Sequence, residues 1–339
     1  MSEIDRISNE PARAAWLYYA EELTQSQIAE KLGVSRSTVI RLLRRAKESG
    51  LVQITLGVST QTFEAERDIE ARYGLKRARI VPGAEDEAMQ RRWIGQIAAE
   101  TLTGMVHDGS IVAVSWGTTL QAMADSLFGE TQVSNMQTVA LVGGLHNASR
   151  GTNPSEVAEQ LGQYFRAPAR ALYAPVYVKN EATAAGLRSD PGLGEALDLA
   201  RNASLVVFGV GALDDNATML KLGYLDPAER AFIERAGAVG DIGCRWIDAD
   251  GRPVPLPPTI HPIGIDLDEL RRIPERLAVA SGATKREIVR ATLRGGYATH
   301  LVTDEACAAF LLADKEGAAA SESSRAASVP ERRAGGRRR

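Results

Sequence analysis

The chain has 339 residues, 44% of them hydrophobic and 24% charged, with a formal net charge of −3, so it can form two or three domains and any DNA binding requires a local basic patch. Two distant cysteines and four scattered histidines argue against a disulfide framework or a zinc site, and we expect neither metal nor cofactor. Without a signal peptide or an apolar run near the roughly 18–20 residues of a spanning helix, we expect a cytoplasmic protein that does not bind membranes.

A helix-turn-helix is predicted over Leu23–Arg45, after loosely ordered residues 1–9 and a helix at Pro11–Leu23. Thr24 and Gln27 have the spacing of a capping box, in which each side chain accepts a backbone N–H of the other. Gly33 suits the left-handed turn that ends the first helix of the motif. These local signals predict the first helix and the turn of a DNA-reading motif.

The second helix of the motif has an apolar face and a basic face. Ala29 is small where two helices cross, and Val39 and Leu42 pack the second helix back onto the first. Between Ser35, its expected cap, and Ser49 there are five basic residues and one acidic residue. The alternative is an ordinary amphipathic helix pair with a solvated basic face. A recognition helix explains better why the spacing, the capping and the charge all agree. The expected DNA contacts are Ser35, Arg36, Ser37, Thr38, Arg41, Arg44 and Arg45.

The next segments lead from this small domain to the main body. Leu51–Leu56 is rich in β-formers and is expected to be a short strand or wing, and Gln61–Tyr73 is expected to be a helix. The last residues are rich in Ala, Ser, Gly and Arg, which predicts a disordered basic tail. We therefore expect a helix-turn-helix domain at 1–56, a linker at 57–62, an α/β domain at 63–314 and the tail at 315–339.

From residue 78 onward, short apolar strands alternate with helical patterns. This rhythm predicts a mostly parallel sheet with helices on both faces. The expected strands are Ala78–Val81, Ile111–Ser115, Thr138–Leu141, Ala169–Leu172, Leu205–Gly209, Ile263–Leu267 and His300–Val302. The expected helices are Arg92–Val106, Leu120–Phe128, Ser155–Phe165, Asp226–Ala236 and Lys285–Leu293.

Three of these strands are followed by glycine-rich loops. In open α/β sheets ligands bind at the carboxyl ends of the strands, and Gly117 with Thr118 and Thr119 offers donors for an anion at a helix start. One such loop is a weak signal, because any strand-turn-helix needs a glycine and a cap. Three together indicate the floor of a pocket. The other glycines concerned are Gly143, Gly144, Gly209 and Gly211.

Three charged residues could converge on this pocket: Glu156, Asp241 and Lys285. A lysine at a helix N-terminus is unfavourable for the helix dipole. This makes Lys285 a better candidate for binding phosphate than a random lysine, with an ordinary surface position as the alternative.

Longer motifs resemble one protein family. They are VSWGTTL at Val114–Leu120, VALVGGL at Val139–Leu145, LVVFGVGAL at Leu205–Leu213, GAVGDIGCRWIDADG at Gly237–Gly251 and SGATKREIVRATLRGGYATHLVTDEACAAFLL at Ser281–Leu312. In this order they are similar to the SorC-type sugar-binding transcriptional regulators, a group that overlaps the DeoR-like regulators. The resemblance runs from the helix-turn-helix to about residue 313.

The resemblance implies an effector domain related to sugar-phosphate isomerases and deaminases, which binds a phosphorylated sugar or sugar alcohol. It places Gly117, Thr118 and Thr119 on the phosphate, with Lys285 as a cationic partner. It implies backbone contacts from Gly143 and Gly144, and sugar-hydroxyl contacts from Glu156 and Asp241. It also implies dimers or tetramers that bind operator DNA near carbohydrate operons, as repressors or activators. Val142 stands where a Schiff-base lysine would be needed, so we expect reversible, non-covalent binding.

The alternative is an isomerase- or deaminase-like enzyme acting on sugar phosphates. Such chemistry needs a general base within reach of the substrate. Asp241, Glu156 and His146 could serve, but nothing in the sequence groups them as an acid and a base. A complete helix-turn-helix also has no role in a plain enzyme, so we expect a transcriptional regulator of a carbohydrate operon.

Overall fold

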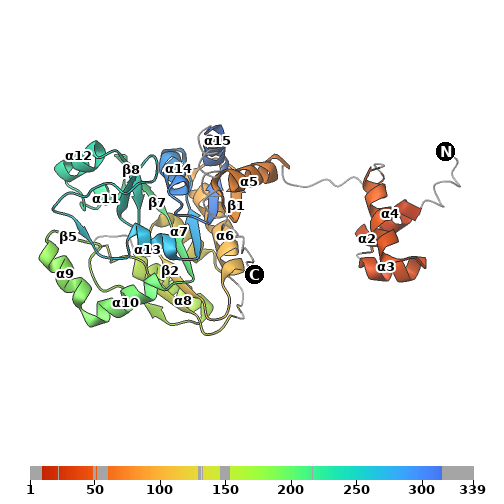
Figure 1. Ribbon diagram of the computed structural model, residues 1–339, viewed down its shortest axis with the longest axis horizontal. Helices are drawn as coiled ribbons and strands as arrows, with labels where there is room; N and C mark the ends of the chain where they lie inside the picture. The colour runs from red at the N-terminus through yellow and green to blue at the C-terminus, as the bar shows by residue number, and fades with distance from the viewer. Residues whose placement is uncertain are drawn as a thin grey trace, which may run out of the picture. The chain divides into compact units, whose positions relative to one another are not determined.

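The computed structural model describes residues 10–21, 23–48, 51, 60–128, 131, 133–145, 153–215 and 217–314. These residues form two compact units that divide between Thr60 and Gln61, inside the predicted linker (Figure 1). The predictions for residues 1–9, for the wing at 52–56, for 57–59 of the linker and for the tail at 315–339 lie outside the described residues. None of the described helices combines the length and the apolar composition needed to span a membrane.

The N-terminal unit has three described helices around a small apolar core. They are α2 (Glu10–Tyr19), α3 (Gln25–Leu32) and α4 (Arg36–Glu48). The predicted capping box is present, because the Gln27 N–H donates to Thr24 Oγ1 and the Thr24 N–H donates to Gln27 Oε1 at 2.9 Å. Gly33 ends α3 at a φ of +65°, in the left-handed region that favours glycine. The core residues come from all three helices: Ala14, Ala15, Leu17, Ile28, Ala29, Val39, Leu42, Leu43 and Ala46.

The second unit is built on a seven-stranded sheet in which every pair of neighbours is parallel. In spatial order the strands are β1 (Arg77–Val81), β12 (His300–Asp304), β11 (Glu275–Val279), β6 (Leu205–Phe208), β2 (Ile111–Val114), β3 (Gln137–Ala140) and β4 (Ala169–Arg170). A small antiparallel sheet contains β7 (Val210–Ala212), β8 (Ala238–Ile242) and β9 (Arg245–Asp248), and a second one pairs β5 (Tyr177–Val178) with β10 (His261–Pro262).

Apolar residues are buried on both faces of the main sheet. Along β6, Val206 and Phe208 belong to one buried cluster, whereas Leu205 and Val207 belong to the other. This alternation is the pattern of a strand covered on both sides. The described helices of this unit, some of which pack on the small sheets, are α5 (Thr60–Tyr73), α6 (Glu87–Met105), α7 (Thr118–Asp125), α8 (Pro154–Phe165), α9 (Glu181–Ser189), α10 (Pro191–Arg201), α11 (Thr218–Lys221), α12 (Pro227–Arg235), α13 (Leu267–Arg272), α14 (Arg286–Arg294) and α15 (Glu305–Ala313).

The predicted strand at residues 263–267 is wrong. Ile263 and Ile265 are buried, but Gly264 between them makes only an isolated bridge to Val142, and Leu267 already begins α13. An alternating apolar pattern can therefore mark an extended, buried loop. The sheet strand of this region is β11 instead. It was not predicted because its first two residues, Glu275 and Arg276, are charged and only its last three are apolar.

Candidate functional site

A cavity of about 170 Å³ lies at the carboxyl ends of the central strands. The chain leaves β2 toward β3 on one side, and it leaves β6 toward β11 on the other. Between β2 and β6 the order of the sheet therefore reverses, and open α/β sheets bind ligands in such a crevice. The cavity is lined by Ser115, Trp116, Gly117, Thr118, Thr119, Leu120, Gly209, Val210, Gly211, Ala212, Asp214, Ala217, Thr218, Met219, Asp241, Gly243, Trp246, Thr284 and Lys285.

One wall of the cavity is the N-terminus of α7. Gly117 precedes the helix with a φ of +126°, and no side chain caps the first turn there. The backbone N–H groups of a first turn carry a partial positive charge and are free to bind an anion. Thr118 is exposed and Thr119 is buried, so two hydroxyls accompany these N–H groups. The wall suits a phosphate or a carboxylate.

Lys285 and Asp241 bring opposite charges to the same cavity. Burial lowers the pKa of the Lys285 ammonium, while the charge of Asp241 counteracts this effect. Burial raises the pKa of the Asp241 carboxyl from 3.8 to about 6. The N–H of Cys244, which donates to Asp241 Oδ2 at 2.8 Å, and the charge of Lys285 both act to lower this pKa, but burial outweighs them. A partly desolvated ammonium near an open helix N-terminus suits an anionic group. The Asp241 carboxylate suits donors such as sugar hydroxyls.

The two glycines after β6 differ in what they allow. A Cβ at Gly211 would lie 2.1 Å from Asp241 Oδ1, so a glycine is required for the carboxylate to occupy its position. A Cβ at Gly209 would make only ordinary contacts, at 3.7 Å from Trp116 O and from Val279 O. Both glycines line the cavity, but only Gly211 is required by the site.

Three predicted effector residues are not among those that line the cavity: Gly143, Gly144 and Glu156. A Cβ at Gly143 would lie 2.5 Å from Pro175 O, so backbone packing accounts for this glycine. Gly144 makes two backbone hydrogen bonds with the neighbouring segment. Its N–H donates to the carbonyl of Ala174 at 2.7 Å, and its carbonyl accepts the N–H of Val176 at 2.9 Å. Glu156 is exposed in the first turn of α8. Their effector contacts stay predictions.

The cavity also contains residues that were not predicted as ligand contacts. Asp214 and Thr218 follow β7, Trp246 lies on β9, and Thr284 precedes Lys285. Asp214 and Trp246 reach the cavity only through the small antiparallel sheet, whose pairing the sequence pattern did not predict. His146, considered as a catalytic group, lies outside the described residues. In the described part of the chain, no three or more His, Cys, Asp and Glu side chains gather as a metal site requires.

In the N-terminal unit, the outward face of α4 is basic. Ser35 caps the helix by accepting the Thr38 N–H at 3.2 Å, as predicted. The Arg36 guanidinium donates to Gln25 Oε1 at 3.3 Å and so connects α4 to α3. The exposed residues of this face are Arg36, Ser37, Ile40, Arg41, Arg44 and Arg45. A helix with this face fits the major groove of DNA.

The buried carboxyl of Asp241 makes stability depend on pH. Its pKa is raised on folding, so the folded state binds more protons between about pH 4 and pH 6, and stability falls as the pH rises through this window. A rise from 3.8 to about 6 corresponds to about 3 kcal/mol. Asp241→Asn keeps an acceptor for the Cys244 N–H, and we expect it to raise the free energy of unfolding by about 1–3 kcal/mol at pH 7.5.

Urea unfolding of both proteins at pH 7.5 and at pH 4 measures this effect. The gain should shrink toward pH 4, because the folded-state carboxyl of Asp241 is then almost fully protonated and carries little charge. A variant that is less stable at pH 7.5, or equally stabilised at both pH values, contradicts the assignment of a destabilising buried charge.

Family models match nearly the whole described chain. Residues 59–313 match the Sugar-bind model, described as a "Putative sugar-binding domain". Residues 9–55 match the HTH_23 model, described as a "Homeodomain-like domain". The two matches fall on the α/β unit and on the helical unit, respectively.

Full-length relatives show the same combination. The chain is 33% identical to the deoxyribonucleoside regulator of Bacillus subtilis, over 92% of this chain and 99% of that protein. It is also 33% identical to the transcriptional regulator LsrR of Klebsiella pneumoniae, over 89% of this chain and 92% of that protein. The fold is similar to the full-length sorbitol operon regulator SorC of Klebsiella pneumoniae, with a TM-score of 0.70 and 24% identity over 92% of this chain and 100% of that one.

Proposed function

The chain belongs to the SorC/DeoR-like family of sugar-binding transcriptional regulators, and from this premise we propose that a phosphorylated sugar or sugar alcohol in the cavity controls its binding to operator DNA. The two close relatives named above are regulators rather than enzymes, so an isomerase or deaminase activity is not favoured. The observation that carries the proposal is that Lys285 and the uncapped first turn of α7 line the same cavity.

The cavity suggests how the two ends of such an effector are recognised. The phosphate binds the backbone N–H groups of Gly117, Thr118 and Thr119 and the hydroxyls of the two threonines, with its charge balanced by Lys285. Asp241 accepts hydrogen bonds from the sugar hydroxyls. A volume of about 170 Å³ is below the range of about 300–1,000 Å³ that drug-sized ligands occupy, which favours a single small sugar.

DNA recognition by this chain calls for more than one copy. One recognition helix touches few base pairs, and each good base contact contributes only about 1–3 kcal/mol of discrimination. A dimer or tetramer places two such helices on half-sites one helical turn apart. Effector control then requires that the ligand bind one arrangement of the copies more tightly, with a typical coupling of about 1–3 kcal/mol.

Thermal unfolding of the full chain with a panel of phosphorylated sugars and polyols tests the effector class. A ligand at about 100 times its Kd adds about 2.7 kcal/mol to the stability of the state it binds. We expect at least one member of the panel to raise Tm by about 5–10 °C, and its unphosphorylated counterpart to have a much smaller effect. No shift with any member, or an equal shift with the unphosphorylated sugars, contradicts the proposal.

A further inference from the structure

Helices α14 and α15 lie between the cavity region and α5, the helix that follows the DNA-binding unit in the chain: α14 begins directly after the cavity residue Lys285, and Asp314, directly after α15, contacts Tyr73 of α5. Lys285 lines the cavity and directly precedes α14, which ends at Arg294. The two helices pack against each other, and the guanidinium groups of Arg286 and Arg290 lie 5.0 and 4.9 Å from the centre of the Phe310 ring. They can therefore move as one body.

At the cavity end, a single carboxylate joins the ligand loop to α15. Asp304 is buried, and its Oδ2 accepts the N–H of Gly282 at 2.6 Å. Its Oδ1 accepts the N–H of Cys307 at 2.8 Å and so caps α15. The Lys285 N–H in turn donates to the carbonyl of Gly282 at 3.0 Å. A displacement of Lys285 therefore acts on the first turn of α15 as well as on α14.

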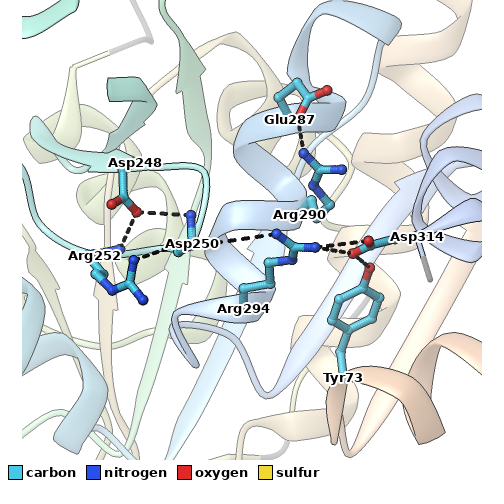
Figure 2. A network of polar contacts seen from close by, with 8 residues as sticks. All are labelled: Tyr73, Asp248, Asp250, Arg252, Glu287, Arg290, Arg294 and Asp314. Atoms are coloured by element: carbon cyan, nitrogen blue, oxygen red, sulfur yellow. Dashed lines mark hydrogen bonds and ion pairs between the residues drawn. The ribbon is translucent and has the colours of Figure 1, made fainter. Parts of the chain in front are cut away.

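At the far end, a polar network joins both helices to the last turn of α5 (Figure 2). Arg294 Nη2 donates to both carboxylate oxygens of Asp314, at 2.9 and 3.1 Å. The Tyr73 hydroxyl lies 3.1 Å from Asp314 Oδ2 and 3.2 Å from the carbonyl of Leu311. Burial and the charge of Asp314 raise the pKa of the Tyr73 hydroxyl, which therefore stays a donor. Arg72 Nη1 donates to the carbonyl of Leu312 at 2.6 Å.

Helix α5 also contacts the edge of the sheet. Glu66 Oε1 accepts the N–H of Ile80, and Glu70 Oε1 accepts the N–H of Ala78, each at 2.8 Å. Helix α5 is thus held between the edge strand β1 and the ends of α14 and α15. A displacement of the ends of α14 and α15 therefore alters their contacts with α5 relative to the contacts that α5 makes with β1.

The geometry points to α14 and α15 as the elements that couple the cavity to α5, with Asp304 and the Tyr73–Asp314–Arg294 network as the joints. The inference rests on the proposed function, because it assumes that an anion occupies the cavity. An anion that binds Lys285 shifts the equilibrium between two positions of α14 only to the extent that it binds one of these positions more tightly than the other. Because the path is a set of packed, hydrogen-bonded elements, removal of one joint should weaken coupling without emptying the cavity.

Amide hydrogen exchange of the full-length chain with and without inorganic phosphate tests the coupling in wild type, Tyr73→Phe and Tyr164→Phe. The first variant removes only the hydroxyl of the network. The second is a matched control on α8, where the Tyr164 hydroxyl donates to Phe128 O at 3.1 Å. We expect phosphate to slow exchange at residues 115–120 and 281–286 in all three proteins. At residues 60–73 we expect a response in wild type and in Tyr164→Phe, and one about fivefold smaller in Tyr73→Phe.

The outcomes separate this inference from the function on which it rests. Slower exchange at the cavity with no change at residues 60–73 in wild type overturns the inference and leaves the proposed function intact. An undiminished response of residues 60–73 in Tyr73→Phe also overturns it. If phosphate does not slow exchange at the cavity, the proposed function fails and the inference fails with it.

Discussion

Replacing Lys285 with methionine is expected to weaken binding of the phosphorylated effector by about 10- to 150-fold, because a hydrogen bond to a charged group contributes about 1.5–3 kcal/mol. Methionine keeps most of the length of the side chain and removes its charge. Burial lowers the pKa of the Lys285 ammonium, so its charge is disfavoured at this position, and we expect the variant to fold with unchanged or higher stability. Isothermal titration with the effector found by thermal unfolding measures the loss.

Lys221→Met is the matched control for this variant. Lys221 is an exposed lysine at the end of α11, and it is not among the residues that line the cavity. Its replacement should leave effector affinity within about twofold of wild type, since exposed charges contribute little. Equal affinity of Lys285→Met and Lys221→Met would remove Lys285 from the phosphate site.

Replacing Arg41 with alanine is expected to weaken operator binding by about 1–3 kcal/mol for each half-site read, which is the range of a bidentate base contact. Arg41 is exposed on the outward face of α4, whereas its neighbours Leu42 and Leu43 are buried in the core. The change should therefore leave the helical unit folded. Fluorescence anisotropy with an operator fragment that the protein itself selects from genomic DNA measures the effect.

Arg67→Ala removes another exposed arginine, on α5, and serves as the control. It should change operator affinity little, and neither variant should change effector affinity. Wild-type operator affinity in Arg41→Ala would contradict the assignment of α4 as the recognition helix.

The helix-turn-helix could be predicted from the sequence because its signals are local. The capping box at Thr24, the left-handed Gly33 and the apolar stripe of α4 all act within about ten residues. The parallel sheet could be predicted for a similar reason, since its buried strands are short apolar runs between helices. Two of the three glycine-rich loops expected to form the pocket, those with Gly117 and Gly209, line the cavity at the reversal of strand order.

What could not be predicted depends on contacts between distant segments. Gly143 has the sequence context of a ligand loop, but its glycine is explained by the approach of the Pro175 backbone. Gly211 has the same context, and its reason is Asp241, thirty positions away, on the paired strand β8. Trp246 enters the cavity because β9 follows β8 in that small sheet. Tertiary pairing decides these cases, and local sequence patterns do not encode it.

The most direct test of the central claim is the operator affinity of the full-length chain, measured with and without the phosphorylated sugar that raises its Tm most. Effector control predicts that the ligand changes operator Kd by at least about fivefold, and that Lys285→Met loses this response while still binding the operator. A ligand that binds the cavity and stabilises the fold, yet leaves operator Kd unchanged, would contradict the claim that the cavity controls DNA binding.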